Sequence, residues 1–547
     1  MSRFYIDTQT IPWEQISRPK VEAVVFRPQT KIYQAPRFND MDKMRALQSR
    51  LIQNIYTRPL AVRQVTQENL KEKNSGIDKK MVTLRPRKRK MARGLQLDEK
   101  TTPIHQMRIL KLRKEEERPR KLQAIKRKAE KIYRFCCALS ALRARKHRVN
   151  QAHFAPRRRK AKKNIDFFFR IALRASSFFW PIPVIEDKAK QALAKMTLET
   201  EWEAYFEPNS YGFILGRSCQ DAAIKAIFLA IRAKPKYVLN ADISKCFNCI
   251  NHEALLNKLK TLPSLAKQVK AWLKADIMTK LGNNPQYMEI INMGTCGIIF
   301  FPLLANIALH GMETALREWA LKAHPKKPTP ILVRYVNNFV VLHQSREVIE
   351  QAQTFLEEWL KCMGLKLHPD KTQIVNTRSG FQFIGFSINH IWKWGRVKTL
   401  ITPSRESRRR FLEEIRRAIQ LSKGKAAYQL IAILVPKIVK WGNYFKYSEC
   451  SNVFRRLDHD IFQKIRAWVY RRHPTWGRDK IKQKYFPKNK SWIFRGKAHQ
   501  DNWILYDSYT TAFKVKKEYY LVKLSWIASH KHIEVGQDKG PIKLQAE

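Results

Sequence analysis

The sequence predicts an α+β protein in which a mixed core of helices and strands is followed by a helical module. Three observations support this prediction. Residues 185–206 carry apolar side chains at helical spacing, and residues 236–243 form a short run typical of a strand. Residues 331–343 hold two β-prone runs around a turn signal, whereas residues 401–486 return to helical periodicity.

Much of the N-terminal 75 residues is expected to be helical. Between residues 41 and 56, apolar side chains recur about every 3.6 residues, which is the spacing of one helix face. These side chains are Met44, Leu47, Leu51, Ile52 and Ile55. The corresponding positions of the 185–206 helix are Ile185, Ala189, Leu193, Met196 and Trp202.

A hairpin turn is expected at Asn337 and Asn338, between the apolar runs 331–336 and 339–342. Asn tolerates left-handed backbone, and two Asn residues between β-prone runs are typical of a hairpin. Asp242 lies at the end of the 236–243 strand. Many polynucleotidyl transferases place one carboxylate after a first strand and one or two at a hairpin tip, where they hold two Mg²⁺ ions. The alternatives are a helix N-cap role for Asp242 and a plain turn for the two Asn residues.

The helical module is expected to contain three helices, over 404–421, 426–447 and 453–472, with Pro436 inside the second. Their outer faces are basic. The first helix carries Arg405, Arg408, Arg409, Arg410, Arg416 and Arg417, and the third ends in Arg471 and Arg472. The candidate RNA-binding residues of this module are Arg405, Arg408, Arg409, Arg416, Arg471 and Arg472. Most aromatic side chains of 426–476 are expected in the core, and Trp476 is a candidate for stacking on unpaired bases.

Net charge indicates the class of partner. The chain has 547 residues, with 106 Lys and Arg against 46 Asp and Glu, a balance of +60. Hydrophobic residues make up 44% and aromatic residues 11%, which excludes a disordered basic tail. An ordinary metabolic enzyme is a poor first hypothesis, because so large a surplus exceeds what solubility requires. The expected partner is therefore RNA, DNA or an anionic membrane surface. The length of the chain separately predicts three or four domains.

The most basic segment is 111–170, which holds 22 Lys and Arg against 5 Asp and Glu, or +17. No acidic residue occurs between 131 and 165, so local ion pairs cannot offset the repulsion. A phosphate-binding arm is therefore favoured over a solvated charged helix. The candidate RNA-binding residues of this arm are Arg143, Arg145, Lys146, Arg148, Arg157, Arg158, Arg159 and Lys160.

Membrane insertion and metal binding are the weaker hypotheses. The uncharged run 290–312 is long enough to span a bilayer, but its Asn, His, Gly and Pro residues favour a buried core segment. The N-terminus lacks the pattern of a signal or transit peptide, so the protein is expected to work in the compartment that makes it. Cys246 and Cys249 form a lone CxxC with no second pair, and reduced core thiols are expected.

Short motifs occur in a fixed order along nearly the whole chain. They are LAVRQVT (60–66), GID (76–78), IED (185–187), FEPNSYGF (206–213), GRSC (216–219), ADI (241–243), PLLANI (302–307), RYVNNF (334–339), HPDKT (368–372) and FIGF (383–386). Together they resemble the reverse transcriptase domain of group II intron-encoded proteins. Lys371 of the HPDKT motif is expected to be a solvated loop lysine, with a vestigial phosphate contact as the alternative.

The departures from the family pattern concern the chemistry. The family's metal-binding hairpin has Tyr-Ala-Asp-Asp where this chain has Tyr335-Val-Asn-Asn338, and a neutral amide is a poorer Mg²⁺ ligand than a carboxylate. Asp242 would alone remain of the expected set. The segment that shapes the family's nucleotide pocket is one residue shorter in this chain, at 294–302. Another family segment is interrupted, because its first half, Arg118-Pro119, is separated from its last half, Ile182-Pro183, by the basic stretch. His530-Lys-His532 has no Cys after it, so no working endonuclease is expected.

The resemblance implies a right-hand polymerase fold with a helical thumb, or maturase, domain. The expected divisions are 1–104 (N-terminal extension and start of the fingers), 105–180 (basic insertion), 181–400 (fingers and palm), 401–490 (thumb) and 491–547 (C-terminal extension). The expected function is that of a group II intron maturase, which binds intron RNA and promotes its folding and splicing.

Two other functions stay open: an active RNA-directed DNA polymerase, and a general RNA-binding protein that reuses the scaffold. No cofactor is expected, with Mg²⁺ required only for residual polymerase activity, and no membrane partner is expected. A chloroplast location with an organelle-encoded gene is favoured, and the bacterial cytoplasm is the alternative.

Overall fold

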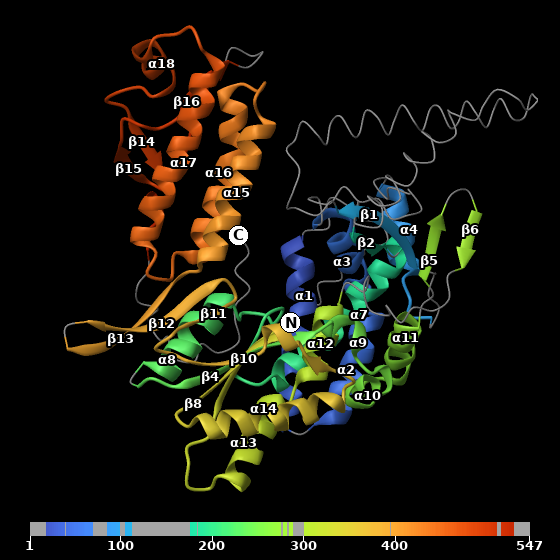
Figure 1. Cartoon of the computed structure of the whole chain (residues 1–547). Helices are drawn as coiled ribbons and strands as arrows, with labels where there is room; N and C mark the ends of the chain where they lie inside the picture. The colour runs from blue at the N-terminus through green and yellow to red at the C-terminus, as the bar shows by residue number, and fades with distance from the viewer. Residues whose placement is uncertain are drawn as a thin grey trace, which may run out of the picture.

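The computed structural model describes residues 18–38, 40–68, 85–98, 104–111, 176–182, 184–232, 234–274, 277–281, 284–287, 300–393, 395–510 and 516–529. Within these residues the predicted α+β class is confirmed: a central sheet with helices is followed by three long helices (Figure 1). Residues 143–160, which hold the candidate arm, lie outside the described ranges. His530 and His532 also lie outside them.

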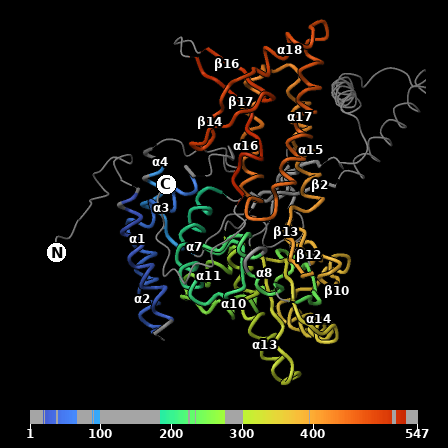
Figure 2. The backbone as a smooth tube through the Cα atoms, turned by 90° about the vertical axis from the view of Figure 1, so that its left-hand side faces the viewer, coloured from blue at the N-terminus to red at the C-terminus, as the bar shows by residue number. Residues whose placement is uncertain are grey.

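The N-terminal helices form a bundle with the long helix α7, which lies beside them (Figure 2). The helices are α1 (Arg18–Gln34), α2 (Met41–Gln53), α3 (Thr57–Arg63), α4 (Arg85–Gly94) and α7 (Ile185–Tyr205). Their shared core contains Ile32, Met44, Leu51 and Leu193. The periodicity correctly predicts α2 and α7, but α2 ends at Gln53 because Asn54 adopts extended backbone.

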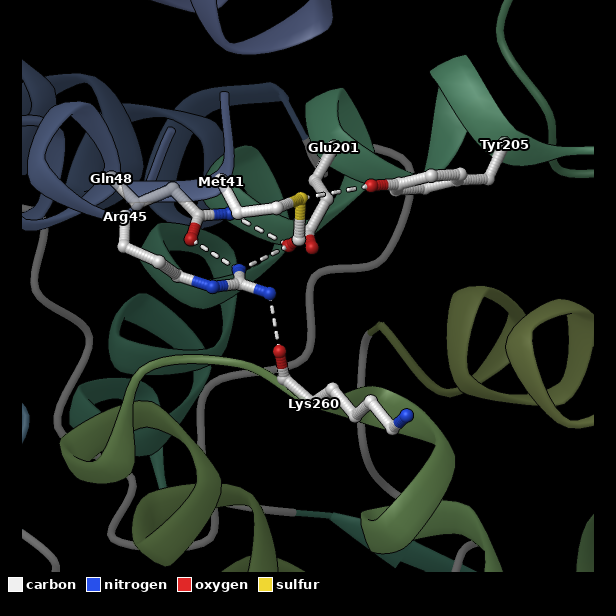
Figure 3. A network of polar contacts seen from close by, with 6 residues as sticks. All are labelled: Met41, Arg45, Gln48, Glu201, Tyr205 and Lys260. Atoms are coloured by element: carbon white, nitrogen blue, oxygen red, sulfur yellow. Dashed lines mark hydrogen bonds and ion pairs between the residues drawn. The ribbon is translucent and has the colours of Figure 1, made fainter. Parts of the chain in front are cut away.

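A buried polar network fastens α2 to α7 (Figure 3). Arg45 donates from Nη1 to Gln48 Oε1 at 2.7 Å and to Glu201 Oε2 at 2.9 Å. Gln48 Nε2 donates to the same Glu201 oxygen at 2.7 Å, and Arg45 Nη2 donates to the carbonyl oxygen of Lys260. Glu201 is 2% exposed, so its charge depends on these donors for stabilisation.

The central sheet has the strand order β10-β4-β8-β7-β3, with the short β9 also pairing with β4. Its strands are β3 (Ser210–Tyr211), β4 (Tyr237–Ser244), β7 (Ile331–Tyr335), β8 (Asn338–His343), β9 (Lys366–Leu367) and β10 (Gln373–Asn376). The predicted strand at 236–243 and the predicted hairpin at 331–343 are thereby confirmed.

Both faces of this sheet are covered, which explains the unbroken apolar runs of β8. Successive side chains point to opposite faces. Phe339 and Val341 belong to one hydrophobic core and Val340 and Leu342 to the other. The first core includes α9 (Cys246–Cys249), α10 (His252–Leu259), α11 (Pro263–Leu273), α12 (Phe301–Leu309), α13 (Met312–Ala323) and α14 (Arg346–Lys361). Helix α12 is buried, as expected for the described part of the 290–312 run, and no described helix is long and apolar enough to cross a membrane.

A separate sheet includes the strands at both ends of the basic insertion. It has the order β2-β1-β5-β6, from β1 (Ile104–Lys111), β2 (Ser176–Ile182), β5 (Ile277–Leu281) and β6 (Asn284–Tyr287). Strands β1 and β2 are antiparallel, with His105 opposite Ile182 and Lys111 opposite Ser176. The chain therefore leaves this sheet after β1 and returns to it beside the point of departure.

The second core joins the sheet to the helical module. It includes α8 (Ile227–Ile231) and the sheet of β11 (Phe381–Phe383), β12 (Phe386–Lys393) and β13 (Arg396–Pro403). The three predicted helices are confirmed as α15 (Arg405–Leu421), α16 (Ala427–Phe445) and α17 (Ser451–Arg472). They stand above the central sheet in the view of Figure 1. Helix α15 begins where predicted because Ser404 caps it, accepting a hydrogen bond from the Ser407 N–H.

The C-terminal segment packs against these helices. It contains α18 (Arg478–Tyr485) and two hairpins, β14 (Ser491–Phe494) with β15 (Lys497–Gln500) and β16 (Tyr506–Thr510) with β17 (Lys516–Tyr520). Asp458 of α17 accepts hydrogen bonds from the backbone N–H groups of Leu524 at 2.7 Å and Ser525 at 2.9 Å. At Gly442 of α16 a Cβ atom would lie 2.2 Å from Ile527 Cδ1, so a larger residue there would force the Ile527 side chain to move.

Candidate nucleic-acid interface

The β7–β8 turn is held in a conformation that its sequence alone disfavours. Tyr335 pairs with Asn338 across the hairpin, which leaves Val336 and Asn337 in the loop. Val336 has φ of +56°, an unusual value for a β-branched residue. The expectation that Asn supplies the left-handed position is therefore wrong. The Val336 N–H donates to the Tyr211 carbonyl oxygen at 3.0 Å, and this contact from another strand helps to hold the turn.

The buried side chain of Arg334 supports the same turn. Its side chain is 0% exposed and donates to Asn306 Oδ1 at 2.9 Å and Ser210 Oγ at 2.9 Å. It also donates to the Val336 carbonyl oxygen at 3.2 Å. Burial lowers the pKa of Arg334 to about 10, and nearby Glu207 opposes part of this shift. The sequence motif contained Arg334, but its role depends on partners from distant segments.

Asp242 is the carboxylate of this site, and both of its oxygens are engaged. Asn337 Nδ2 donates to Oδ1 at 2.7 Å, and Lys371 Nζ lies 2.5 Å from Oδ2. Asn338 Nδ2 in turn donates to Asn337 Oδ1 at 3.2 Å. The residue is 8% exposed. The site thus joins β4, the β7–β8 turn and the turn that holds Lys371.

Two interpretations made from the sequence, one for Asp242 and one for Lys371, are wrong. Asp242 is not a helix N-cap, because Lys245 precedes α9 and the Asp242 carboxylate contacts Asn337 and Lys371 instead. Lys371 is not a simple solvated lysine, although more than half of its side chain is exposed, because it forms the ion pair with Asp242. The pairing joins residues 129 positions apart in the chain, so no local pattern signals it.

The residues present do not fit a two-Mg²⁺ site of the kind that polymerases use. Such a site needs several carboxylates around two cations. Asp242 has only amides at the facing hairpin positions Asn337 and Asn338, and an ammonium group contacts its second oxygen. Among the described residues, no group of three His, Cys, Asp or Glu side chains lies close enough to hold a metal ion.

A basic groove of about 800 Å³ lies between α15 and α17. The predicted residues Arg405, Arg408, Arg409 and Arg416 line it. Helix α17 adds Arg456 and Lys464 to this lining. The sequence reasoning missed these two residues because it assigned the α17 pattern to the core. Their spacing of eight residues, two helical turns on one face, could have indicated them.

The groove has an apolar floor and a mixed charge. Its lining comprises Gln382, Arg405, Glu406, Arg408, Arg409, Leu412, Glu413, Arg416, Val453, Arg456, Leu457, Asp460 and Lys464. Six cationic side chains therefore face three carboxylates. The Nε atom of Arg408 is buried and has no hydrogen-bond partner. This combination can attract a polyanion and can also hydrogen-bond to donor groups on a ligand.

The remaining predicted residues lie elsewhere. Arg472 donates to the Lys425 carbonyl oxygen, and its guanidinium lies 5.3 Å from the centre of the Trp468 ring, so it helps to fix the end of α17. Arg471 lies exposed beside it. Trp476 already stacks on His473, with 4.0 Å between ring centres.

A smaller groove of about 630 Å³ separates α15 from α16. Arg410, Lys437 and Lys440 line it beside Trp441 and Tyr444. Two of these cations are paired, Arg410 with Glu406 at 3.1 Å and Lys437 with Glu414. The α15–α17 groove is accordingly the better candidate for phosphate contacts.

Comparison with known families agrees with this geometry. Residues 13–95 match the N-terminal domain of reverse transcriptase, and residues 179–388 match reverse transcriptase (RNA-dependent DNA polymerase). Residues 408–486 match the group II intron, maturase-specific domain. Asp242, Asn337 and Lys371 lie within the second match, and most of the residues that line the α15–α17 groove lie within the third.

Individual relatives are distant. The chain is 25% identical over 268 residues to the protein YkfC of Escherichia coli (strain K12), covering 42% of this chain and 68% of YkfC. It is 31% identical over 160 residues to the group II intron-encoded protein LtrA of Lactococcus lactis subsp. cremoris, covering 28% of this chain and 25% of LtrA. It is 25% identical over 287 residues to Maturase-like protein 1 of Euglena gracilis, covering 51% of this chain and 56% of that protein.

The chain thus spans between a quarter and about two thirds of the length of these relatives. The three domain matches occur in the order in which the sequence motifs predict them, and together they account for the palm sheet and the helical module. The chain belongs to the family of group II intron-encoded reverse transcriptases and maturases.

Proposed function

We propose that this protein is an intron maturase. It binds a group II intron RNA, stabilises the folded form of that RNA and so promotes splicing, while the RNA itself carries out the transesterification. The observation that carries this proposal is the α15–α17 groove, whose six cations lie almost wholly within the segment that matches the maturase-specific domain. Arginine suits this role because its planar guanidinium binds phosphate oxygens in pairs.

The proposal includes a palm that no longer supports polymerisation. Asp242 is engaged by Asn337 and by Lys371, and the facing hairpin positions carry amides. The scaffold around the turn is nevertheless intact, since Arg334 and Tyr211 still fix its backbone. A retained scaffold with an altered centre is expected where RNA binding is maintained and DNA synthesis is not.

Salt-dependent RNA binding tests the first part of the proposal. If about ten phosphates are contacted, at a slope of about −0.7 for each, affinity should fall roughly 10⁴-fold between 50 and 200 mM salt. The double substitution Arg409→Gln with Arg456→Gln should lower the slope by between one and two and weaken binding. The control is Arg346→Gln, an exposed arginine of α14 that is ion-paired with Glu350. Affinity with little salt dependence would contradict the proposal.

Splicing then tests the biological role. Intron-containing RNA incubated with the protein at low Mg²⁺ should splice faster than RNA alone, and the Arg409/Arg456 variant should lose most of this acceleration. Sequencing of RNA crosslinked to the protein distinguishes a maturase from a general RNA-binding protein. Enrichment of intron sequence supports the maturase, whereas an even distribution over cellular RNA supports the other function.

An active reverse transcriptase is the second candidate, favoured by the match over 179–388. Primer extension on an RNA template, with Mg²⁺ and then with Mn²⁺, separates the two functions. Robust cDNA synthesis by the unmodified protein would overturn the proposal that the palm has lost this chemistry.

The proposed location is the chloroplast, with the gene carried by the organelle and the bacterial cytoplasm as the alternative. The maturase-like relative in Euglena gracilis supports an organelle, whereas the relatives in Escherichia coli and Lactococcus lactis favour bacteria. An open reading frame inside an intron of organelle DNA would decide between them.

A further inference from the structure

The α15–α17 groove has a property that phosphate binding alone does not explain. Glu413 and Asp460 line it among the cations, and a carboxylate repels a phosphate backbone. Glu413 is four residues after Arg409 and three before Arg416, and Asp460 lies four residues from both Arg456 and Lys464. These spacings permit ion pairs along each helix.

Those pairs do not form in the described part of the chain. The only ion pair there that involves a groove carboxylate joins Arg410 to Glu406, at 3.1 Å. Among the described residues, Glu413 and Asp460 therefore line the groove beside cations with which they form no ion pair. The buried Nε atom of Arg408 adds a donor without a partner. A ligand that carries both anionic oxygens and N–H donors would satisfy both sets at once.

The size and floor of the groove narrow the class of ligand. Its volume of about 800 Å³ lies in the range of roughly 300–1,000 Å³ that is typical of small-molecule sites. Leu412, Val453 and Leu457 supply apolar surface against which a flat ring can pack. A carboxylate accepts two hydrogen bonds side by side. Guanine, with its N1–H and its 2-amino group, presents two parallel donors on its Watson–Crick edge.

We propose that this groove binds one unpaired guanosine of the RNA. The base packs on Leu412, Val453 and Leu457, its Watson–Crick edge donates to Glu413 or Asp460, and the flanking phosphates contact the arginines. Single-stranded RNA is commonly recognised in this way, by unstacked bases whose edges are hydrogen-bonded. The inference rests on the proposed function, since it assigns a ligand to the RNA-binding surface of the maturase.

Short oligonucleotides test the proposal on the full-length protein. Fluorescence anisotropy would compare a U₁₀ RNA, the same RNA with one central guanosine, and the same RNA with inosine, which lacks the 2-amino group. The guanosine RNA should bind about tenfold more tightly than U₁₀, as expected for one bidentate contact to a base. The inosine RNA should lose most of this preference.

Substitutions then assign the preference to the groove. Glu413→Gln combined with Asp460→Asn should abolish the guanosine preference, so that this variant binds the guanosine RNA and U₁₀ with equal affinity. Glu414→Gln is the matched control, because Glu414 lies on the same helix but lines the other groove and pairs with Lys437. Arg456→Gln should weaken all three RNAs by a similar factor.

The possible outcomes are distinct. If the double variant binds every RNA more tightly and the native protein shows no guanosine preference, the carboxylates only offset repulsion and the inference is wrong. Intron binding that survives in that case leaves the maturase proposal standing. If the native protein instead fails to bind intron RNA, or binds it without salt dependence, the proposed function itself is wrong. Thermal unfolding of each variant confirms that it is folded.

Discussion

Lys371 Nζ lies 2.5 Å from Asp242 Oδ2, on the side of the carboxylate opposite the one that Asn337 engages. In a polymerase of this family the resemblance implies that a metal ion would balance the same carboxylate. In this chain the ammonium group of Lys371 balances the Asp242 carboxylate. The neutral amide of Asn337 stands where the family has a second carboxylate. The arrangement is a brace between three segments of the palm.

Removing the carboxylate should therefore destabilise the protein. Asp242→Ala leaves the Asn337 amide without its acceptor and Lys371 without its partner, so the free energy of unfolding should fall by about 2 kcal/mol. Urea unfolding measures this change. Asp370→Ala, an exposed neighbour of Lys371, is the control and should cost less than about 0.5 kcal/mol. Equal effects of the two substitutions would show that the brace contributes nothing.

Restoring the family's carboxylates should make the palm sensitive to metal. Asn337→Asp with Asn338→Asp places two further negative charges beside Asp242 and removes the donor to its Oδ1 atom. The double variant should melt at a lower temperature than the native protein in EDTA and should regain much of the loss in 10 mM Mg²⁺. The native protein should show no Mg²⁺-dependent shift. A large shift in the native protein would contradict the metal-free brace.

Stability should depend on pH through Glu203 of α7. Burial raises the pKa of Glu203 to about 7, and Arg217, 3.9 Å away, opposes only part of this shift. Between pH 4.5 and 7 the native state keeps a proton that the unfolded chain has released. The free energy of unfolding should therefore fall as the pH rises through this window, by at most about 1.4 kcal/mol per pH unit.

Urea unfolding at several pH values checks this dependence. Glu203→Gln cannot titrate, so its unfolding free energy should lack this component and should decline less steeply between pH 5 and 7. Glu350→Gln, on an exposed face of α14, should keep the native slope. Identical slopes for the native protein and Glu203→Gln would rule out a protonated Glu203 in the folded state.

The N-terminal helices should depend on Arg45. Arg45→Ala leaves the buried Glu201 carboxylate with Gln48 as its one side-chain donor among the described residues, so the free energy of unfolding should fall by about 3 kcal/mol. Lys43→Ala, which removes an exposed ion pair on the same helix, should cost less than about 1 kcal/mol. Denaturation followed by circular dichroism compares the two. A small effect of Arg45→Ala would mean that apolar packing alone holds α2 to α7.

The sequence predicted the elements whose causes are local. Helix α15 begins at its Ser404 cap, and the β7–β8 hairpin forms where two apolar runs meet, because capping and apolar periodicity act over a few residues. The domain types also followed from the collinear motifs. The positive φ of Val336 could not be predicted, because Tyr211 and Arg334 fix it from other parts of the fold.

Prediction of the candidate site failed where distant segments meet. Four of the groove arginines follow from the composition of α15, but Arg456 and Lys464 join them only when α17 packs alongside. The Lys371–Asp242 pair has the same origin, since β4 and the Lys371 turn are far apart in the chain. Contacts of this kind require knowledge of which helix or strand lies next to which, and one-dimensional patterns do not contain it.

The register of β1 and β2 bears on how the charge of this protein could have been acquired. Lys111 stands opposite Ser176, and antiparallel partners lie only about 5 Å apart. The intervening residues 112–175 carry 22 Lys and Arg against 5 Asp and Glu, and a short turn could close the same two strands without them. Within the sheet, the two ends of this stretch therefore lie beside each other. The β1–β2 register itself sets no lower limit on the length or charge of this stretch, so both can change through evolution without altering the pairing of the two strands.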